Sequence, residues 1–382
     1  MQTILVFTSG TMSLPRKIAG IQRFARQRNW NVQQIVAPAT SAKVRRLIDF
    51  WRPAGCIVEA SGGLKLGPKP FGGVPVVFLD QDPAIVAGDA PLVRHDPAAI
   101  ATLAAKELMP IARHYAFIDW FTPVYWAADK RAVFREILDL HGHPCHIFTP
   151  HPSDQTRPLA FQKRLRQWVA RLPAPCGIFA VNDSLGAAVI AAAAACGRAI
   201  PDDISVVGVD DDEAVCENTH PTMSSILPDF EGTGYRTAEL LSKLIDNSHP
   251  PPRTIELMPP LRVVRRQSTR LFAETDAKVA EAVEYIRLHV TSGIRACDVA
   301  ELFPCSRRLA EIRFRRMTGR SFLDEIAAVR MERTFDLLRR PDVAISAVAD
   351  LCGWPSVCIF HRRFKALTGL SPGTWRRQNT SA

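Results

Sequence analysis

Two aspartates of this 382-residue chain follow apolar stretches that are typical of buried strands. Asp183 comes after residues 177–181, and Asp210 ends the run Ile-Ser-Val-Val-Gly-Val-Asp. In doubly wound sheets, ligands bind at the carboxyl ends of strands, and carboxylates there accept hydrogen bonds from neighbouring hydroxyls of a sugar. Helix capping is the alternative role for an aspartate at such a turn. We expect Asp183 and Asp210 to bind a ligand, and Asp211 and Asp212 to cap the next helix.

A second candidate for chemistry is a pair of short helices near the C-terminus. Residues 345–352 place apolar side chains at helical spacing, and Gly353 permits a sharp turn after them. The next helix, capped by Ser356 and ended by Gly369, has an apolar stripe on one face and a basic face opposite. Such a pair is typical of a helix-turn-helix DNA reader.

The same pattern occurs 50 residues earlier. Amphipathic helices that end in glycine occur in many helical domains, so one copy alone would be weak evidence. Two copies in register favour a domain with two DNA-reading helices. The matching positions are Ser306, Phe314, Thr318, Gly319 and Ser321 in the first copy, and Ser356, Phe364, Thr368, Gly369 and Ser371 in the second.

The second helix of each copy is expected to enter a major groove. Arg308 is the best candidate for a guanine contact, because arginine pairs bidentately with O6 and N7. Glu311 could accept from cytosine or pair with a nearby arginine, Val357 could meet a thymine methyl, and Arg362 suits a base or a phosphate. The residues predicted to face DNA are Arg307, Arg308, Glu311 and Arg315 in the first helix, and Val357, Cys358, His361, Arg362 and Lys365 in the second.

Excess positive charge is concentrated at this end of the chain. Residues 262–382 hold 22 Lys and Arg against 13 Asp and Glu, whereas residues 1–261 hold 26 against 25. Lys and Arg neutralise phosphates and release counterions, which gives salt-dependent affinity for nucleic acid. An ordinary solvated surface would not predict this asymmetry.

The preceding part of the chain alternates apolar strands with amphipathic helices, from a strand over residues 4–8 to a helix over residues 230–245. This alternation predicts parallel, doubly wound α/β sheets. The strands are too many for one small sheet, so two lobes with a cleft between them are expected. In the first helix, residues 14–29, the side chains predicted to point outward are Arg16, Lys17, Arg23, Arg26 and Arg28.

Residues 276–382 resemble the AraC-type DNA-binding domain. The matching signature is Arg330-x-Glu-Arg, Leu337-Leu338, Ile345-x-x-Val-Ala-x-x-Cys-Gly, Ser356-x-x-x-Phe-x-x-x-Phe-Lys, Thr368-Gly and Ser371-Pro. The resemblance implies an all-α domain in which one long helix, residues 322–339, joins two helix-turn-helix units. Ala310 stands where the family has leucine, beside Leu309, so the rotation of the first reading helix is open.

Residues 1–268 resemble the effector domains of LacI/GalR regulators, which are relatives of periplasmic sugar-binding proteins. The matching stretches are Phe179-Ala-Val-Asn-Asp, Ile200-Pro-x-Asp-Ile-Ser-Val-x-Gly-Val-Asp and Met223-Ser-Ser-Ile. A LacI-like sensor joined to an AraC-type reader resembles the family of xylose operon regulators. That resemblance implies D-xylose as effector and activation of pentose catabolism genes.

The resemblance also implies further ligand contacts. Arg16 opens the first helix, and Asp96 begins another, where capping alone would also explain it. Relatives place an arginine four residues before an aromatic. Here that position holds Lys130, with Arg131 beside it, so which cation reaches the sugar is open. Trp126 could stack on the apolar face of a sugar or belong to the core.

The sequence shows no hydrolase, metalloprotease or nucleotide-binding motif, and neither a cofactor nor a metal is expected. Nine cysteines without CxxC spacing favour reduced thiols. No signal peptide precedes the first strand and no apolar run reaches the roughly 20 residues of a membrane span, so a cytoplasmic location is expected. We expect a sugar-responsive transcriptional regulator, not an enzyme, that acts as a homodimer with duplex DNA and RNA polymerase as partners. The alternatives are the same architecture with another sugar or a nucleoside, and a solute-binding protein without DNA function.

Overall fold

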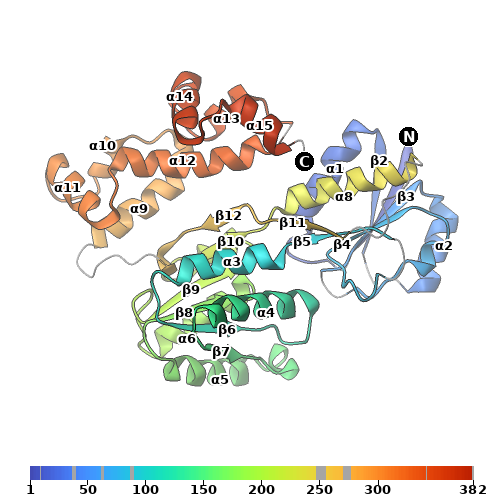
Figure 1. The fold of residues 1–382 in the computed structure, drawn as a ribbon, viewed down its shortest axis with the longest axis horizontal. Coiled ribbons are helices and arrows are strands. Elements are labelled where there is room, and N and C mark those ends of the chain that lie inside the picture. Colours follow the sequence, from blue (N-terminus) through green and yellow to red (C-terminus); the bar gives the residue numbers. More distant parts are fainter. Residues whose placement is uncertain are drawn as a thin grey trace. The chain divides into compact units, whose positions relative to one another are not determined.

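The computed structural model describes residues 1–8, 10–36, 40–61, 64–86, 90–246, 255–269, 277–340 and 342–380. The chain divides into two compact units, Met1–Thr269 and Arg270–Ala382. The first unit contains α/β lobes and the second is helical (Figure 1). No helix among the described residues is long and apolar enough to cross a membrane.

The N-terminal lobe is built on a six-stranded sheet with the order β11-β5-β4-β3-β1-β2, and its described pairings are parallel. Alternate residues of β1 point to opposite faces. Ile4 and Val6 pack against helices α1 and α8, and Leu5 and Phe7 pack on the side of α2. The elements are β1 (Gln2–Thr8), α1 (Leu14–Gln27), β2 (Trp30–Val36), α2 (Ser41–Trp51), β3 (Gly55–Glu59), β4 (Val76–Leu79), β5 (Leu92–His95), α8 (Phe230–Ile245) and β11 (Ile255–Met258).

The second lobe has the sheet order β12-β10-β9-β8-β6-β7, in which β12 runs antiparallel to β10 and the other described pairings are parallel. The chain passes between the two lobes after β5, after β10 and between β11 and β12. The elements are α3 (Pro97–Leu108), β6 (His114–Ile118), α4 (Tyr125–Leu140), β7 (Cys145–Phe148), α5 (Pro158–Arg171), β8 (Cys176–Ala180), α6 (Asp183–Ala195), β9 (Ile204–Val209), α7 (Glu213–Cys216), β10 (Ser224–Leu227) and β12 (Arg262–Val264).

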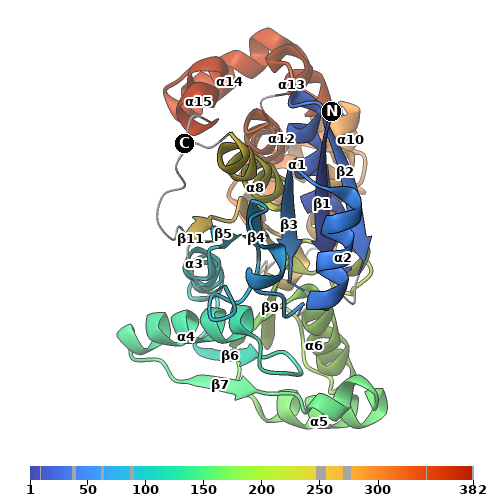
Figure 2. The same ribbon diagram turned by 90° about the vertical axis from the view of Figure 1, so that its right-hand side faces the viewer.

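Helices α1 and α8 lie side by side and pack with almost no space between their backbones (Figure 2). A Cβ on Gly20 would lie 1.9 Å from the carbonyl oxygen of Glu231, and one on Gly234 would lie 2.0 Å from that of Lys17. Glycine is therefore required at both positions for this close approach.

The prediction that Lys17 and Arg23 point outward is wrong. Their residues are only 1% and 7% exposed. Each is buried against an acidic partner: Lys17 Nζ lies 2.8 Å from Glu59 Oε1, and Arg23 Nη1 lies 2.9 Å from Glu231 Oε1. Helical spacing alone could not reveal partners that lie on β3 and α8.

The second unit holds two hydrophobic cores joined by α12. Ile326 and Val329 of α12 belong to the first core, and Met331 and Leu338 belong to the second. The helix predicted over residues 322–339 is thus confirmed, with its end at Leu338. The helices are α9 (Ala277–His289), α10 (Ala296–Ala300), α11 (Arg307–Thr318), α12 (Phe322–Leu338), α13 (Ile345–Leu351), α14 (Val357–Thr368) and α15 (Pro372–Thr380). Residue 276, where the resemblance to the AraC-type domain begins, lies outside the described residues.

Local capping sets the ends of α11 and α14, as predicted. The Ser306 hydroxyl accepts from the Leu309 amide at 3.4 Å, and the Ser356 hydroxyl accepts from the Ile359 amide at 3.3 Å. Gly319 and Gly369 follow with φ of 72° and 75°, which glycine adopts without strain. The predicted architecture, two parallel-sheet α/β lobes and a helical domain with two helix-turn-helix units, is confirmed.

Candidate ligand and DNA sites

Asp183 is held by two hydrogen bonds at the start of α6. Its carboxylate accepts from Ser225 Oγ at 2.6 Å and from the backbone amide of Asp212 at 2.8 Å. The cap of α6 is the neighbouring Asn182, whose side chain accepts from the Leu185 amide at 3.1 Å. Capping of α6 therefore does not explain Asp183.

The backbone beside Asp183 is shaped around its carboxylate. A Cβ on Gly208 of β9 would lie 2.2 Å from Asp183 Oδ1, so only glycine leaves room for the side chain. Burial, reinforced by the nearby charge of Asp210, raises the pKa of Asp183 to about 8. Burial therefore favours the protonated form of this carboxyl.

Asp210 and Asp211 follow β9 in a conformation that side chains rarely adopt. Their φ angles are 109° and 47°, and strain of this kind collects at functional sites. Burial raises the pKa of Asp210, although Lys130 opposes the shift. Asp212 caps α7 through the Ala214 amide at 3.1 Å, as predicted. Asp211 does not act as a cap, because its carboxylate pairs with Arg266 at 2.8 Å.

The structure separates the two candidate cations of α4. Lys130 is buried, donates to the Val181 carbonyl at 3.2 Å, and interacts electrostatically with Asp210 and Asp183. Burial lowers the pKa of Lys130, while these carboxylates raise it. Arg131 pairs instead with Asp119. Lys130 is thus the cation beside the carboxylate pair.

The other predicted ligand residues have varied surroundings. The ring of Trp126 lies 5.2 Å from Lys130 Nζ and is half-buried against the core. Arg16 lies over the ring of Phe230 at 4.5 Å and donates to the Asp210 carbonyl. Asp96 caps α3, accepting from the Ala98 and Ala99 amides at 2.8 and 3.0 Å. Capping accounts for Asp96, whereas Arg16 and Lys130 lie at the carboxylate pair.

The sequence interpretation missed a buried ionic cluster at the strand ends of the N-terminal lobe. Lys17 Nζ lies 2.8 Å from Glu59 and 2.7 Å from Asp80, and His95 Nε2 lies 3.5 Å from Asp80. Burial lowers the pKa of His95 to about 4 despite the neighbouring carboxylate. Glu59 ends an apolar strand and Asp80 directly follows one, as Asp210 does, so the same signal could have found them.

Two contacts connect the lobes beside this cluster. The Tyr125 hydroxyl of α4 donates to the carbonyl of Asp80, which follows β4. Arg94 of β5 pairs with Asp129 of α4 and lies 4.9 Å from the ring of Tyr125. The first turns of α4 thus contact the N-terminal lobe and also carry Lys130.

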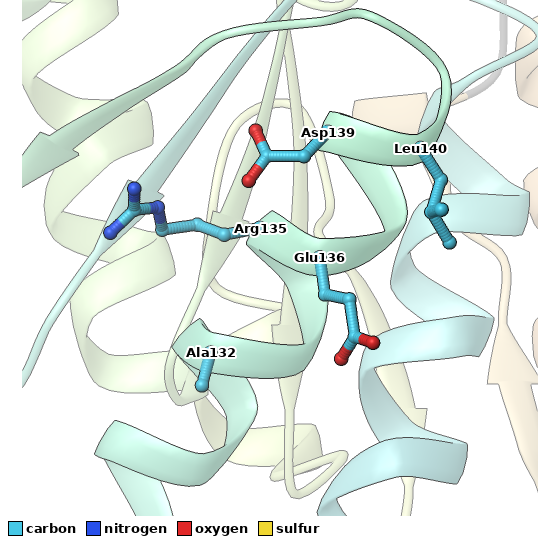
Figure 3. Close-up of a pocket in the computed structure, with 5 residues that line it drawn as sticks. All are labelled: Ala132, Arg135, Glu136, Asp139 and Leu140. Carbon is cyan, nitrogen blue, oxygen red and sulfur yellow. The ribbon is translucent and has the colours of Figure 1, made fainter.

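A separate hollow lies on the outer side of α4, lined by Ala132, Arg135, Glu136, Asp139 and Leu140 (Figure 3). All five residues come from one helix. The hollow holds neither the strand-end carboxylates nor Lys130. It is not the candidate ligand site.

In the first reading helix, α11, the structure determines the rotation that the sequence left open. Ala310 is fully buried with Phe314, whereas Leu309 is 48% exposed. Arg307, Arg308 and Arg315 are exposed, as predicted.

Glu311 does not project outward as predicted. Its carboxylate accepts from the Phe322 amide at 3.1 Å and so holds the start of α12. The fully outward position belongs to Ile312, which is 55% exposed and was missed. Ile312 follows Arg308 by one helical turn, so the two share a face.

The second reading helix, α14, presents the predicted side chains. Phe360 and Phe364 are fully buried. The predicted DNA-facing residues Val357, Cys358, His361, Arg362 and Lys365 are all exposed.

Comparisons with known proteins agree with this division. Residues 112–269 match the family model of a periplasmic binding protein-like domain, and residues 299–378 match that of a helix-turn-helix domain. The chain is 28% identical over 255 residues to the xylose operon regulatory protein of Escherichia coli (strain K12), which covers 67% of this chain and 65% of that protein. A xylose operon regulatory protein of Haemophilus influenzae is also 28% identical, over 67% of this chain and 66% of its own length. The matched region thus spans about two thirds of these relatives.

Solved structures share the fold. One described as the xylose-binding transcription activator xylR matches 99% of this chain and 98% of its own, with a TM-score of 0.60 and 22% identity. A LacI family transcriptional regulator from Enterococcus faecium with bound ribose matches 70% of this chain and 98% of its own, with a TM-score of 0.58 and 21% identity. Each of the two units of this chain therefore shares its fold with the xylR structure.

Proposed function

We propose that this chain is a sugar-responsive transcriptional regulator, which binds D-xylose in its first unit and duplex DNA through its second. The observation that carries the proposal is the union of a periplasmic binding protein-like domain and a helix-turn-helix domain in one chain. Its curated relatives with 28% identity are named xylose operon regulatory proteins.

The sugar site lies where Asp183, Asp210 and Lys130 meet, with Arg16 at the same turn. Carboxylates accept hydrogen bonds from vicinal hydroxyls, and a buried cation offsets the charge that they gather. Asp183 retains both of its protein hydrogen bonds and can still bind a hydroxyl, because a protonated carboxyl offers one O–H donor besides its remaining acceptor sites. This chemistry suits a polyhydroxylated ligand better than an apolar one.

The DNA site consists of the outward faces of α11 and α14. Arg308 and Ile312 in the first helix and Arg362 in the second are positioned to meet base edges, and Lys365 to contact phosphate. A homodimer would present these readers to repeated half-sites. The proposal includes activation of pentose catabolism genes through RNA polymerase, in the cytoplasm.

A thermal-shift panel with the full chain tests the sensor. D-xylose, other pentoses, hexoses and nucleosides are compared at equal concentration. A rise in melting temperature is expected with D-xylose, because a ligand that binds only the folded state stabilises it. A shift with ribose or a nucleoside alone would overturn the choice of ligand.

DNA binding is tested with the full chain and a random duplex library at low ionic strength. Repeated rounds of selection are expected to enrich sites with two half-sites about one helical turn apart. If the chain retains no duplex in this selection, the proposed function as a DNA-binding regulator is wrong.

A further inference from the structure

Arg266 has the largest fully buried side chain among the described residues, and its exposed fraction is 1%. It lies just after β12, in a segment that we call the junction, residues 265–269. The junction ends the first unit, and from Thr269 the chain continues into the helix-turn-helix unit. A buried guanidinium must be matched by acceptors, or it would destabilise the fold.

All of these acceptors belong to one short segment of the second lobe. Arg266 Nη1 donates to Asp211 Oδ1 at 2.8 Å and to the Met223 carbonyl at 3.2 Å. Its Nε donates to Glu217 Oε1 at 2.7 Å. Arg266 therefore clamps residues 211–223, the segment that follows β9.

The same segment is held from the other side by Asp183. The Asp212 amide and Ser225 Oγ donate to Asp183 at 2.8 and 2.6 Å, and the Asp211 amide donates to Ser225 Oγ at 3.1 Å. Asp210, with its φ of 109°, begins this turn. A displacement of the turn at residues 210–212 is thus felt both at the sugar carboxylates and at Arg266.

The remainder of the junction is anchored in the same lobe. Ser268 Oγ donates to the Val206 carbonyl at 2.6 Å, and the Ser224 amide donates to Ser268 Oγ at 2.8 Å. Thr269 Oγ1 lies 2.8 Å from Ser224 Oγ and donates to Glu107 at 2.8 Å. These bonds fix the residues between Arg266 and the end of the first unit at Thr269.

We propose that Arg266 is the positioning residue through which the sugar site acts on the junction that leads to the DNA-binding unit. The inference rests on the proposed function, because it takes Asp183 and Asp210 as sugar contacts. A sugar that binds one position of this turn more tightly than others biases the turn toward that position. Because Arg266 is hydrogen-bonded to Asp211, it moves with Asp211 and shifts the junction.

Hydrogen–deuterium exchange of the full chain tests this inference, read on peptides that cover residues 262–269. In the wild-type chain, saturating D-xylose should slow exchange of these amides at least about threefold. Arg266→Lys keeps the charge but loses the planar fork. This variant should still bind D-xylose, with its junction exchange no longer responding.

Two further variants make the result specific. Asp211→Asn removes the charged acceptor and leaves Arg266 in place, so it should also lose the response, even if Arg266→Lys folds poorly. Arg265→Lys is the matched control. Arg265 lies in the same junction, but it is half-exposed and pairs with Glu107 of α3 at 2.7 Å. This control should keep the wild-type response.

Each outcome decides between the two proposals. If the wild-type chain binds D-xylose without any change in junction exchange, the role of Arg266 is overturned and the proposed regulator function is unaffected. A wild-type response in both Arg266→Lys and Asp211→Asn does the same. If none of the sugars binds, the sensor function fails and the inference fails with it.

Discussion

At the scale of single residues, the surroundings of Asp183 decide its protonation. Its ordinary pKa of 3.8 rises to about 8 in the folded chain because of burial and the nearby Asp210. The folded chain therefore binds a proton that the unfolded chain has already released between about pH 4 and pH 8. The contribution of Asp183 to folding stability therefore falls as the pH rises through this window and is level above it.

Asp183→Asn should remove part of this pH dependence, because an amide does not titrate. The free energy of unfolding of the wild-type chain should fall more steeply than that of the variant, by up to about 1.4 kcal/mol per pH unit. Urea denaturation at several pH values between about 5 and 8 measures both slopes. Parallel curves would contradict the raised pKa.

Arg308 permits a prediction about base recognition. Arg308→Ala should weaken binding to a selected operator by about 1–3 kcal/mol and relax the preference at one base position. Competition between duplexes that differ at single positions measures this change. Equal weakening on every duplex would instead assign Arg308 to a phosphate. Lys278→Ala, a charge-matched control on α9, should leave the base preference unchanged.

Residue types at strand ends were readable from the sequence, whereas partnerships between distant residues were not. Asp183 and Asp210 were predicted because each follows an apolar strand. Lys17 has the spacing of an exposed position, and only the fold brings Glu59 and Asp80 against it. Glu311 was likewise predicted to face DNA. Its bond to the Phe322 amide depends on how α11 meets α12, which the sequence does not show.

At the scale of elements, the contact between α1 and α8 has no room for a methyl group at Gly234. Gly234→Ala should force the helices apart and cost about 1–3 kcal/mol of stability. Sugar affinity should also fall, because α1 carries Arg16. Urea denaturation and a D-xylose titration measure the two effects. Gly73→Ala, where the added Cβ would meet nothing within 4 Å, is the control.

Helix α12 permits a second prediction, because it serves both helix-turn-helix units. Arg330 of α12 donates to the Ile294 carbonyl at 2.9 Å beside the first helix-turn-helix unit. Its guanidinium also lies 6.0 Å from the ring of Trp354 in the second helix-turn-helix unit. Arg330→Met should destabilise the DNA-binding unit by about 1.5–3 kcal/mol, the usual worth of a hydrogen bond from a charged group. Exchange rates of α10 and α13 amides should rise together. Arg333→Met on the same helix is the control, and a rise in only one of the two helices would contradict the linking role.

Element boundaries followed from local signals where such signals exist. The ends of α11 and α14 are set by a serine cap and a glycine, and both were predicted. The short strand β11 was not predicted, because it exists only through its pairing with β5, which lies more than 150 residues earlier in the chain. The sequence alone does not show where the chain returns to the first sheet.

At the scale of the whole molecule, sensing and DNA binding are assigned to different units. The net positive charge belongs almost entirely to residues 262–382, whereas Asp183 and Asp210 lie in the first unit. DNA affinity should therefore fall steeply with salt, while sugar affinity should hardly change. Any influence of one ligand on the affinity for the other is a coupling free energy between the two sites.

Coupling of this kind must be equal in both directions. If saturating D-xylose changes the affinity of the full chain for a selected operator by some factor, saturating operator must change the affinity for D-xylose by the same factor. A factor between about 5 and 150 is typical of such systems. Fluorescence anisotropy with labelled duplex and calorimetric titration with sugar, at one fixed ionic strength, measure the two factors. Factors of one in both titrations would mean that the sensor does not regulate DNA affinity. Arg266→Lys should reduce both factors together, because a residue that couples two sites must affect each of them equally.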